Sequence, residues 1–493
     1  MKTATVCTLN EENINSFMDS ARKASEDILE SVSDGRKIFV ISHIDADGIS
    51  AAGIMGKALL RVGAIFSIRI ERWVDEKVLE EVRLHGGEDT LLVFTDMGSG
   101  YLDVLGAKLG DRQIIILDHH QPIGKPRKNF LQVNPHLFGM DGSKEISSSG
   151  ISYFVAKFMS KKNLDLAHLA IVGALGDLQD KYEGRKLGGL NDIIVKDAIE
   201  SEFLNVETDL LFFGRETRPL HKALAYTTNP YIPGISGEED KSLAFLNNLN
   251  IELKRNDRWR ALRDLSQEEK RRLFSALHDY LISKGFRSEV AMSLIGTVYV
   301  FVREEPWTPL RDAREYALLL NATGRMKTPS LGVAICMGDR SRAYEEAFKT
   351  LEEYRQTITR YLAWLNENPS RIEEWENIYI LHGEKDIDEG AISTISTIIL
   401  TNLPKPDKPL IAYSHIPREG MLKISARATD RLVDMGVNIG EIMRISAEKC
   451  FGMGGGHNIA AGAQVPYEQK AQFLKTVNSL VGEYIARIKS AGS

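Results

Sequence analysis

The chain has few cysteines and no long apolar segment. Its three cysteines, Cys7, Cys336 and Cys450, lie far apart in the 493 residues. This spacing excludes a disulfide framework and a structural CxxC zinc site, and it is typical of a reducing cytosol. The chain has no apolar signal core near its first residues and no apolar run of about 18 residues, so we expect a cytoplasmic protein without a membrane span.

The chain also lacks an excess of positive charge. Its net charge is −6, so no global field attracts it to nucleic acid, and any such contact requires a local basic groove. With 43% hydrophobic and 26% charged residues the composition is that of an ordinary globular protein. The length predicts roughly two to four domains.

Metal-seeking side chains follow an apolar run near the start of the chain. The run Ile38–Ile41 predicts a buried strand of a parallel sheet, and His43, Asp45 and Asp47 follow where this strand ends. Ligands bind at the carboxyl ends of strands in such sheets. An Asp-x-Asp-Gly string alone is equally typical of a solvated turn. The side chains at other strand ends must therefore decide between a turn and a ligand site.

Two further apolar runs end in the same kinds of side chain. Strands predicted over 91–94 and 113–117 are followed by Asp96 and by the triplet Asp118, His119, His120. A helix predicted over 166–174 leads to Asp177. Strands that alternate with helical segments predict a parallel sheet of the α/β class, which would gather these residues at one edge.

Carboxylates with some imidazole and no thiolate suit manganese or magnesium better than a zinc cage. The number of candidate ligands is sufficient for two ions. Two ions at roughly 3.5–4 Å clamp the attacking and leaving oxygens of a phosphoryl displacement. We expect two divalent cations, with manganese favoured over magnesium because imidazole softens the site.

Several stretches resemble one known family, the DHH-family phosphoesterases. Its four successive motifs are similar to HIDADG at 43–48, the strand end at Asp96, DHH at 118–120 and GALGD at 173–177. The stretch LNATGRM at 320–326 resembles a segment of RecJ exonucleases. KISARAT at 423–429 and GMGGGHNIAAGA at 452–463 resemble the DHH-associated domain.

The resemblance implies roles for these residues. His43, Asp45 and Asp96 would hold one ion. The second ion would be held by Asp96 as the bridging ligand together with Asp47, His119 and Asp177. Asp118 and His120 would be catalytic: Asp118 would orient a neighbouring imidazole. His120 would contact the scissile phosphate or assist proton transfer.

Substrate binding is expected in the later motifs. Gly454, Gly455 and Gly456 would form a loop that lets the backbone approach a phosphate or sugar, with His457 as a donor beside it. Arg427, on a predicted strand, would offer phosphate a guanidinium fork. Arg325 and Asn321 would either face the nucleic acid or tie parts of the chain together.

The resemblance implies an α/β fold with a parallel-sheet DHH catalytic domain, a helical insertion and a smaller α/β C-terminal DHH-associated domain. The expected ranges are 1–214 and 291–340 for the catalytic domain, 215–290 for the insertion, 341–375 for a connecting helix and 376–493 for the DHH-associated domain. The insertion is highly charged and carries a capping-box pattern from Ser266 to Glu269. It would be a solvated helical module or, by resemblance to archaeal RecJ-like proteins, a docking site for GINS or a helicase.

The resemblance implies a metal-dependent exonuclease of archaeal RecJ type that acts on single-stranded DNA or RNA from an end, in DNA replication or repair. Cleavage of DNA in the 5′ to 3′ direction is favoured. Two alternatives remain: an oligonucleotide or cyclic-dinucleotide phosphodiesterase, and a replisome or helicase-associated scaffold that has lost catalysis.

Overall fold

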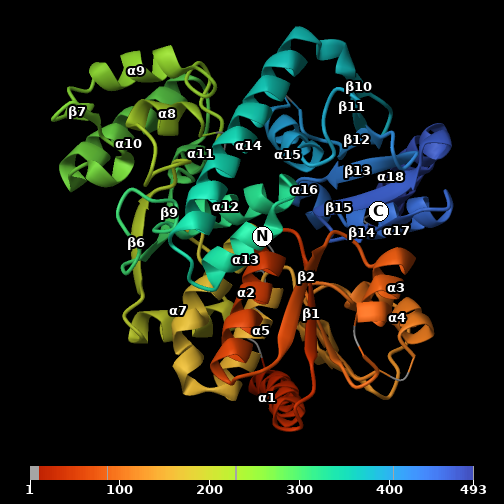
Figure 1. The fold of residues 1–493 in the computed structure, drawn as a ribbon. Coiled ribbons are helices and arrows are strands. Elements are labelled where there is room, and N and C mark those ends of the chain that lie inside the picture. Colours follow the sequence, from red (N-terminus) through yellow and green to blue (C-terminus); the bar gives the residue numbers. More distant parts are fainter. Residues whose placement is uncertain (1–9, 86, 111, 228–229, 404, 492–493) are drawn as a thin grey trace. The chain divides into compact units, whose positions relative to one another are not determined.

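A computed structural model describes residues 10–85, 87–110, 112–227, 230–403 and 405–491 (Figure 1). The chain forms two compact units, Met1–Leu351 and Glu352–Ser493, here called the N-terminal and C-terminal units. Cys7 lies outside the described residues, whereas Cys336 and Cys450 are buried free thiols. Within the described residues, no helix is both long enough and apolar enough to cross a membrane.

A five-stranded parallel sheet forms the centre of the N-terminal unit. Its strands are β1 (Ile38–His43), β2 (Phe66–Glu71), β3 (Leu91–Thr95), β4 (Ile114–Leu117) and β5 (Phe130–Val133), in the order β2-β1-β3-β4-β5. The apolar runs of β1, β3 and β4 are buried because helices cover both faces of the sheet. The predicted parallel sheet is therefore confirmed, and β5 is a strand that was not predicted from the sequence.

Helices α1 and α2 lie on one side of this sheet together with α5, and α3 and α4 lie on the other (Figure 1). The helices of this part are α1 (Glu11–Ser33), α2 (Ala46–Arg61), α3 (Glu76–His85), α4 (Leu102–Lys108), α5 (Ser148–Met159), α6 (Ala167–Gly176), α7 (Leu190–Glu200), α12 (Ala313–Arg325) and α13 (Pro329–Cys336). Small residues let α2 pack closely on its neighbours. A Cβ added to Gly53 would lie 2.2 Å from the Cβ of Cys336 in α13.

The charged insertion is helical, as predicted, and it has its own apolar core. Its elements are α8 (Leu220–Ala225), α9 (Glu239–Asn247), β7 (Lys254–Arg255), β8 (Arg258–Trp259), α10 (Gln267–Ser283) and α11 (Ser288–Met292). Leu246, Leu262, Leu273 and Leu277 are fully buried in this core. The antiparallel pair β6 (Leu204–Leu210) and β9 (Ile295–Phe301) flanks the insertion in the sequence.

The capping box predicted at the start of α10 is confirmed. Ser266 Oγ accepts a hydrogen bond from the Glu269 backbone N–H at 3.2 Å, and Glu269 Oε2 accepts from the Ser266 N–H at 2.7 Å. The Glu269 carboxylate also accepts hydrogen bonds from both terminal nitrogens of Arg260, at 2.7 and 2.8 Å. The Arg260 hydrogen bonds lower the pKa of Glu269 to about 2.

We expect Glu269→Gln to destabilise the insertion at neutral pH by about 1 kcal/mol, since the pair keeps some solvent contact. The folded pKa of Glu269 lies below its unfolded value, so the stabilisation is complete above pH 4.5 and is lost as the pH falls toward about 2. The free energies of unfolding of the parent and the variant, measured in urea, should therefore converge as the pH falls from 4.5 to about 2. A difference that stays constant with pH, or an equal effect of the exposed control Glu268→Gln, would contradict the assignment.

The C-terminal unit contains a six-stranded sheet in the order β10-β11-β12-β13-β15-β14. The strands are β10 (Ile372–Glu374), β11 (Tyr379–Glu384), β12 (Leu410–Ile416), β13 (Met421–Arg427), β14 (Met453–Gly456) and β15 (Ala460–Pro466). Its helices are α15 (Ile392–Asn402), α16 (Asp430–Asp434), α17 (Ile439–Glu448) and α18 (Lys470–Ala491). The strand predicted to carry Arg427 is thus present as β13.

Two expectations differ from the observed elements here. The glycine run at 454–456 forms the edge strand β14 instead of a loop, because its backbone pairs with β15 in antiparallel register. The helix expected over 341–375 is α14 (Arg342–Glu367), which stops before Pro369 and is followed by β10. Proline disfavours helical backbone in the preceding residue, which explains the early end.

Candidate metal centre

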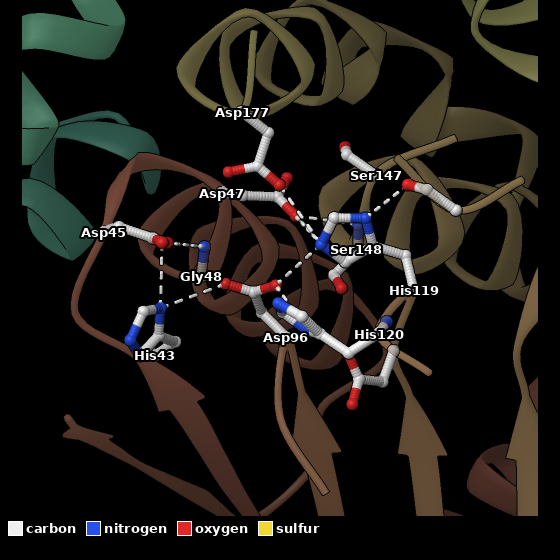
Figure 2. Close-up of polar contacts among 12 residues, drawn as sticks. His43, Asp45, Asp47, Gly48, Asp96, His119, His120, Ser147, Ser148 and Asp177 are labelled. Carbon is white, nitrogen blue, oxygen red and sulfur yellow. Dashed lines mark hydrogen bonds and ion pairs between the residues drawn. The ribbon is translucent and has the colours of Figure 1, made fainter. Parts of the chain in front are cut away.

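The six predicted metal-ligand residues come together at the carboxyl edge of the parallel sheet (Figure 2). They come from four places in the fold. His43 ends β1, and Asp45 and Asp47 stand at the N-cap and in the first turn of α2. Asp96 follows β3, His119 follows β4, and Asp177 is the C-cap of α6.

The donor atoms form two groups that share Asp96. In the first group, His43 Nδ1 lies 2.9 Å from Asp45 Oδ2 and 3.4 Å from Asp96 Oδ2. In the second, His119 Nε2 lies 3.1 Å from Asp177 Oδ2, 3.4 Å from Asp96 Oδ1 and 4.0 Å from Asp47 Oδ2. Within each group the donor atoms lie within 4.8 Å of one another. Asp96 thus directs one oxygen to each group.

The backbone at Asp96 is in an unfavourable conformation that turns its carboxylate between the two groups. Asp96 has φ 59, in the left-handed region that side chains rarely occupy, and its N–H donates to Leu117 O at 3.0 Å. Strain of this kind concentrates at functional sites. Because Asp96 follows the buried strand β3, its neighbours hold it in place.

The carboxylate of Asp47 is fixed by the start of α5. Its Oδ2 and Oδ1 accept the backbone N–H groups of Ser148 and Ser149 at 2.7 and 3.0 Å. A helix N-terminus favours negative charge, so α5 orients this buried carboxylate. This contact was not predicted from the sequence, in which the serine run at 147–149 is the available signal.

The ring of His119 is oriented by a carbonyl and an amide network. Its Nδ1 lies 2.7 Å from Gly142 O, which also accepts from Gln179 Nε2 at 3.0 Å. Asn191 Nδ2 donates to Gln179 Oε1 at 2.8 Å, and this bond fixes the orientation of the amide. Donation from Nδ1 leaves Nε2 available as a metal ligand. Gln179 and Asn191 were missed from sequence, although Gln179 stands two residues after Asp177.

We expect Gln179→Ala to weaken divalent-metal binding by about 10- to 100-fold, as is typical when a partner of a ligating histidine is lost. The measurement is manganese affinity by calorimetry on the full chain. In a double-mutant cycle, Asn191→Ala should add little to Gln179→Ala, because the two side chains act through the same bond. Full additivity of the two effects would show that they act separately.

Asp118 joins His120 and Asp96 in a third group of metal-type donors, and within this group Asp118 pairs with His120. Its Oδ1 lies 2.7 Å from His120 Nδ1, and its Oδ2 accepts from the Ser99 N–H at 2.9 Å. The His120 side chain is 32% exposed, whereas that of Asp118 is 1% exposed. Burial opposes the charged ring, but the carboxylate of Asp118 more than offsets this and raises the pKa of His120.

The ligand groups concentrate negative charge in a buried place. Burial, and then the charges of Asp96 and Asp177, raise the pKa of Asp47 well above its usual range. Burial also opposes a charged His43, yet Asp45 and Asp96 raise the pKa of His43 to about 10. Both carboxylate oxygens of Asp96 are buried without a hydrogen-bond partner. These carboxylate and imidazole donors fit hard or borderline divalent cations.

Asp180, the first aspartate after Asp177 in the sequence, is not part of the candidate metal centre. Asp180 is buried, but its Oδ2 accepts from Arg185 Nε at 2.9 Å and from Arg314 Nη2 at 2.8 Å. It therefore ties α12 to the loop after α6, and Asp177 alone of the two lies among the metal-type ligands.

Helix α12, which carries the LNATGRM stretch, braces the loop between β1 and α2. Asn321 Oδ1 accepts the Ala46 N–H at 3.0 Å, so this side chain ties two parts of the N-terminal unit together. A Cβ on Gly324 would lie 1.7 Å from Ile44 O, so only glycine permits this approach. Arg325 occupies the last turn of α12.

The other predicted substrate residues lie in the C-terminal unit. Arg427 ends β13, where its Nε donates to Thr397 Oγ1 at 2.9 Å and one Nη lies 3.4 Å from Ser393 O. Gly454, Gly455 and Gly456 lie in the edge strand β14, and His457 follows them. Contacts with α15 thus hold the Arg427 guanidinium.

Three family matches cover most of the chain. Residues 37–174 match the N-terminal domain of the DHH family, residues 212–295 the DHH-CID domain, and residues 376–483 the DHHA1 domain. The chain is 33% identical over 455 residues to the uncharacterized protein MJ0831 of Methanocaldococcus jannaschii, which covers 91% of this chain and 94% of that protein.

A second relative is the single-stranded-DNA-specific exonuclease RecJ of Thermus thermophilus, 25% identical over 187 residues, which are 36% of this chain and 27% of RecJ. The crystal structure of that RecJ with Mn²⁺ has a TM-score of 0.56 at 18% identity, over 94% of this chain and 55% of RecJ. CDC45 from Entamoeba histolytica has a TM-score of 0.61 at 14% identity, over 94% of this chain and 99% of CDC45.

These structural likenesses show a shared fold, and the chain spans about half the length of RecJ. The order of the three matched domains follows the order expected from the sequence motifs. With a 33% identical relative matched over nearly its whole length, this chain belongs to the DHH family of phosphoesterases and is RecJ-like in its fold.

Proposed function

We propose that the chain is a metal-dependent exonuclease that hydrolyses phosphodiester bonds at an end of single-stranded nucleic acid. The observation that carries the proposal is the position of Asp96, whose two oxygens face two separate groups of ligands. A ligand shared in this way suits two divalent cations, with manganese favoured and magnesium the alternative. Such ions, when bound, activate water and neutralise charge on a phosphoryl group.

The residues of the chain would divide the remaining work. His43 and Asp45 would complete one ligand group, and Asp47, His119 and Asp177 the other. His120, outside both groups and held by Asp118, would donate a hydrogen bond from its ring to an oxygen of the scissile phosphate or a proton to the leaving oxygen. The raised pKa of His120 supports a charged ring that can donate.

Single-stranded nucleic acid is the proposed substrate because the relative RecJ is named for its specificity for single-stranded DNA. The C-terminal unit, through Arg427, the glycine strand and His457, would hold the strand, with Arg325 as a further contact in the N-terminal unit. Cleavage of DNA from 5′ to 3′, in replication or repair, is the favoured form. RNA is the alternative substrate.

The insertion would serve as a partner-docking module. It matches the DHH-CID domain, and the fold of the chain is similar to that of CDC45. We propose GINS or a replicative helicase as the partner. A scaffold that has lost catalysis would be expected to lack ligands, whereas the full predicted set is retained here.

Digestion of end-labelled single strands tests the proposed activity. DNA and RNA of matched sequence, labelled separately at each end, should release mononucleotides from one end when manganese is present. Asp96→Ala should abolish this release, and the labelled end that disappears first gives the polarity. Digestion confined to very short oligonucleotides or cyclic dinucleotides would favour the smaller-substrate phosphodiesterase. No hydrolysis of any of these substrates would favour the scaffold.

A further inference from the structure

An exposed aromatic ring lies just before the glycine strand β14 in the sequence. Phe451, two residues before β14, is 83% exposed, the highest value for a large apolar side chain in the described part of the chain. A side chain exposed to this extent contributes little apolar burial to folding. The fold of the C-terminal unit therefore does not explain why phenylalanine occupies this position.

The backbone conformation at Phe451 is a second reason why phenylalanine is unexpected at this position. Its φ is 56, and the chain leaves α17 through a Schellman turn in which the Gly452 N–H donates to Ala447 O at 2.9 Å. The Phe451 N–H donates to Glu448 O at 3.3 Å in the same turn. Glycine is the usual residue at this left-handed position because it has no Cβ. An exposed phenylalanine here is unfavourable for the backbone and points to a function for the ring.

The surroundings of the ring suit an extended chain. Strand β14 is an edge of the sheet, so one side of its backbone is not covered by a neighbouring strand. Met453, at the start of this strand, is 36% exposed. Lys449, two residues before Phe451 in the sequence, is also exposed and carries a positive charge. Proteins that bind single-stranded nucleic acid combine positive charge with exposed aromatic rings on which the bases stack.

We propose that Phe451 is a stacking position for an unpaired base of the nucleic acid strand. This inference deepens the proposed function and rests on it. Base stacking needs only one accessible ring face, whereas protein partners bind through well-packed, desolvated clusters of side chains. The exposed ring of Phe451 offers such a face and therefore favours a base over a protein partner.

Strand binding with and without bases tests the proposal. We would use the full chain carrying Asp96→Asn, which prevents digestion, and compare a short DNA strand of mixed sequence with an abasic strand of equal length. The background protein should bind the base-containing strand more tightly. Phe451→Ala should remove about 10-fold or more of this preference, and Phe451→Trp should retain it. Leu84→Ala, which removes another exposed apolar side chain, is the matched control and should change nothing.

A glycine variant separates binding from folding. Phe451→Gly should lose the preference for bases as Phe451→Ala does, yet its thermal unfolding midpoint should equal or exceed that of the background protein, because glycine relieves the left-handed backbone. A fall in the midpoint that parallels the fall in binding would show that Phe451 acts through the fold, and would overturn the proposal.

Two further outcomes would also overturn it: equal affinity for the two strands before any change at Phe451, and a preference that survives in Phe451→Ala. Loss of a dimer in Phe451→Ala, with base preference unchanged, would assign the ring to a second copy of this chain. If the base preference depends on Phe451 but the parent hydrolyses no strand, the stacking position stands and the proposed exonuclease fails. If the parent hydrolyses strands but the base preference survives in Phe451→Ala, the proposed exonuclease stands and the stacking position fails.

Discussion

Replacing Asp96 by asparagine is expected to remove metal-dependent hydrolysis while leaving the metal-free protein folded. Asp96 is the residue common to both ligand groups, so its loss affects both. Metal ions contribute several kcal/mol of transition-state stabilisation, which corresponds to a rate loss of about a thousandfold or more. In the metal-free protein, Asp96 raises the pKa of buried Asp47 by charge repulsion, after the larger effect of burial. Asp96 also raises the pKa of His43, so loss of this charge relieves Asp47 but removes a partner of His43, and we expect little net change in the unfolding temperature.

Thermal unfolding with and without manganese checks the binding part of this expectation. Manganese at 100 times its dissociation constant should stabilise the parent by about 2.7 kcal/mol, and this gain should vanish in Asp96→Asn. Asp165→Asn is the matched control, because Asp165 is a carboxylate of the same unit that pairs with Arg61 outside the centre. A manganese-induced shift that persists in Asp96→Asn, or is lost in Asp165→Asn, would contradict the assignment.

Replacing Gly324 by alanine is expected to destabilise the N-terminal unit and weaken metal binding together. Alanine normally favours a helix over glycine by about 1 kcal/mol, so helix propensity alone predicts the opposite result. The added Cβ would lie 1.7 Å from Ile44 O, a backbone atom that cannot rotate away. Overpacking of this kind costs about 1–3 kcal/mol or more. Because Ile44 lies between His43 and Asp45, the shift should displace both ligands.

Urea unfolding and manganese calorimetry of Gly324→Ala measure the two effects. Gly100→Ala is the control, since a Cβ at Gly100 meets nothing within 4 Å. Loss of stability with unchanged manganese affinity would show that α12 supports the fold but does not position the β1 to α2 loop. An increase in stability would show that the loop adjusts without strain.

The juxtaposition of the candidate metal ligands was predictable because most of them follow an element that the sequence indicates locally. His43 and Asp96 come directly after apolar runs, and parallel pairing brings the ends of β1 and β3 side by side. The strand order did not need to be known, because carboxyl ends of neighbouring parallel strands share one edge. The glycine run was harder, since Gly454 to Gly456 carry no side chains that indicate a strand, and only pairing with β15 makes them one.

The supporting contacts were not predictable, because they join residues far apart in sequence through backbone atoms. The Ser148 N–H reaches Asp47 across 101 positions, and Asn321 reaches the Ala46 N–H across 275. Every residue has a backbone N–H and C=O, so neither the contact of Gly142 O with His119 nor the close approach of Gly324 to Ile44 has a signature in residue type.

The sequence by itself therefore determined the α/β class, the candidate ligands and their chemistry, since side-chain type and local periodicity carry that information. The tertiary structure alone decided that Asp96 faces both ligand groups, that Asp118 holds His120 and that Asp180 belongs to an ion pair instead of the centre. The physical reason is that donor direction depends on backbone conformation and long-range packing, as the left-handed backbone of Asp96 illustrates.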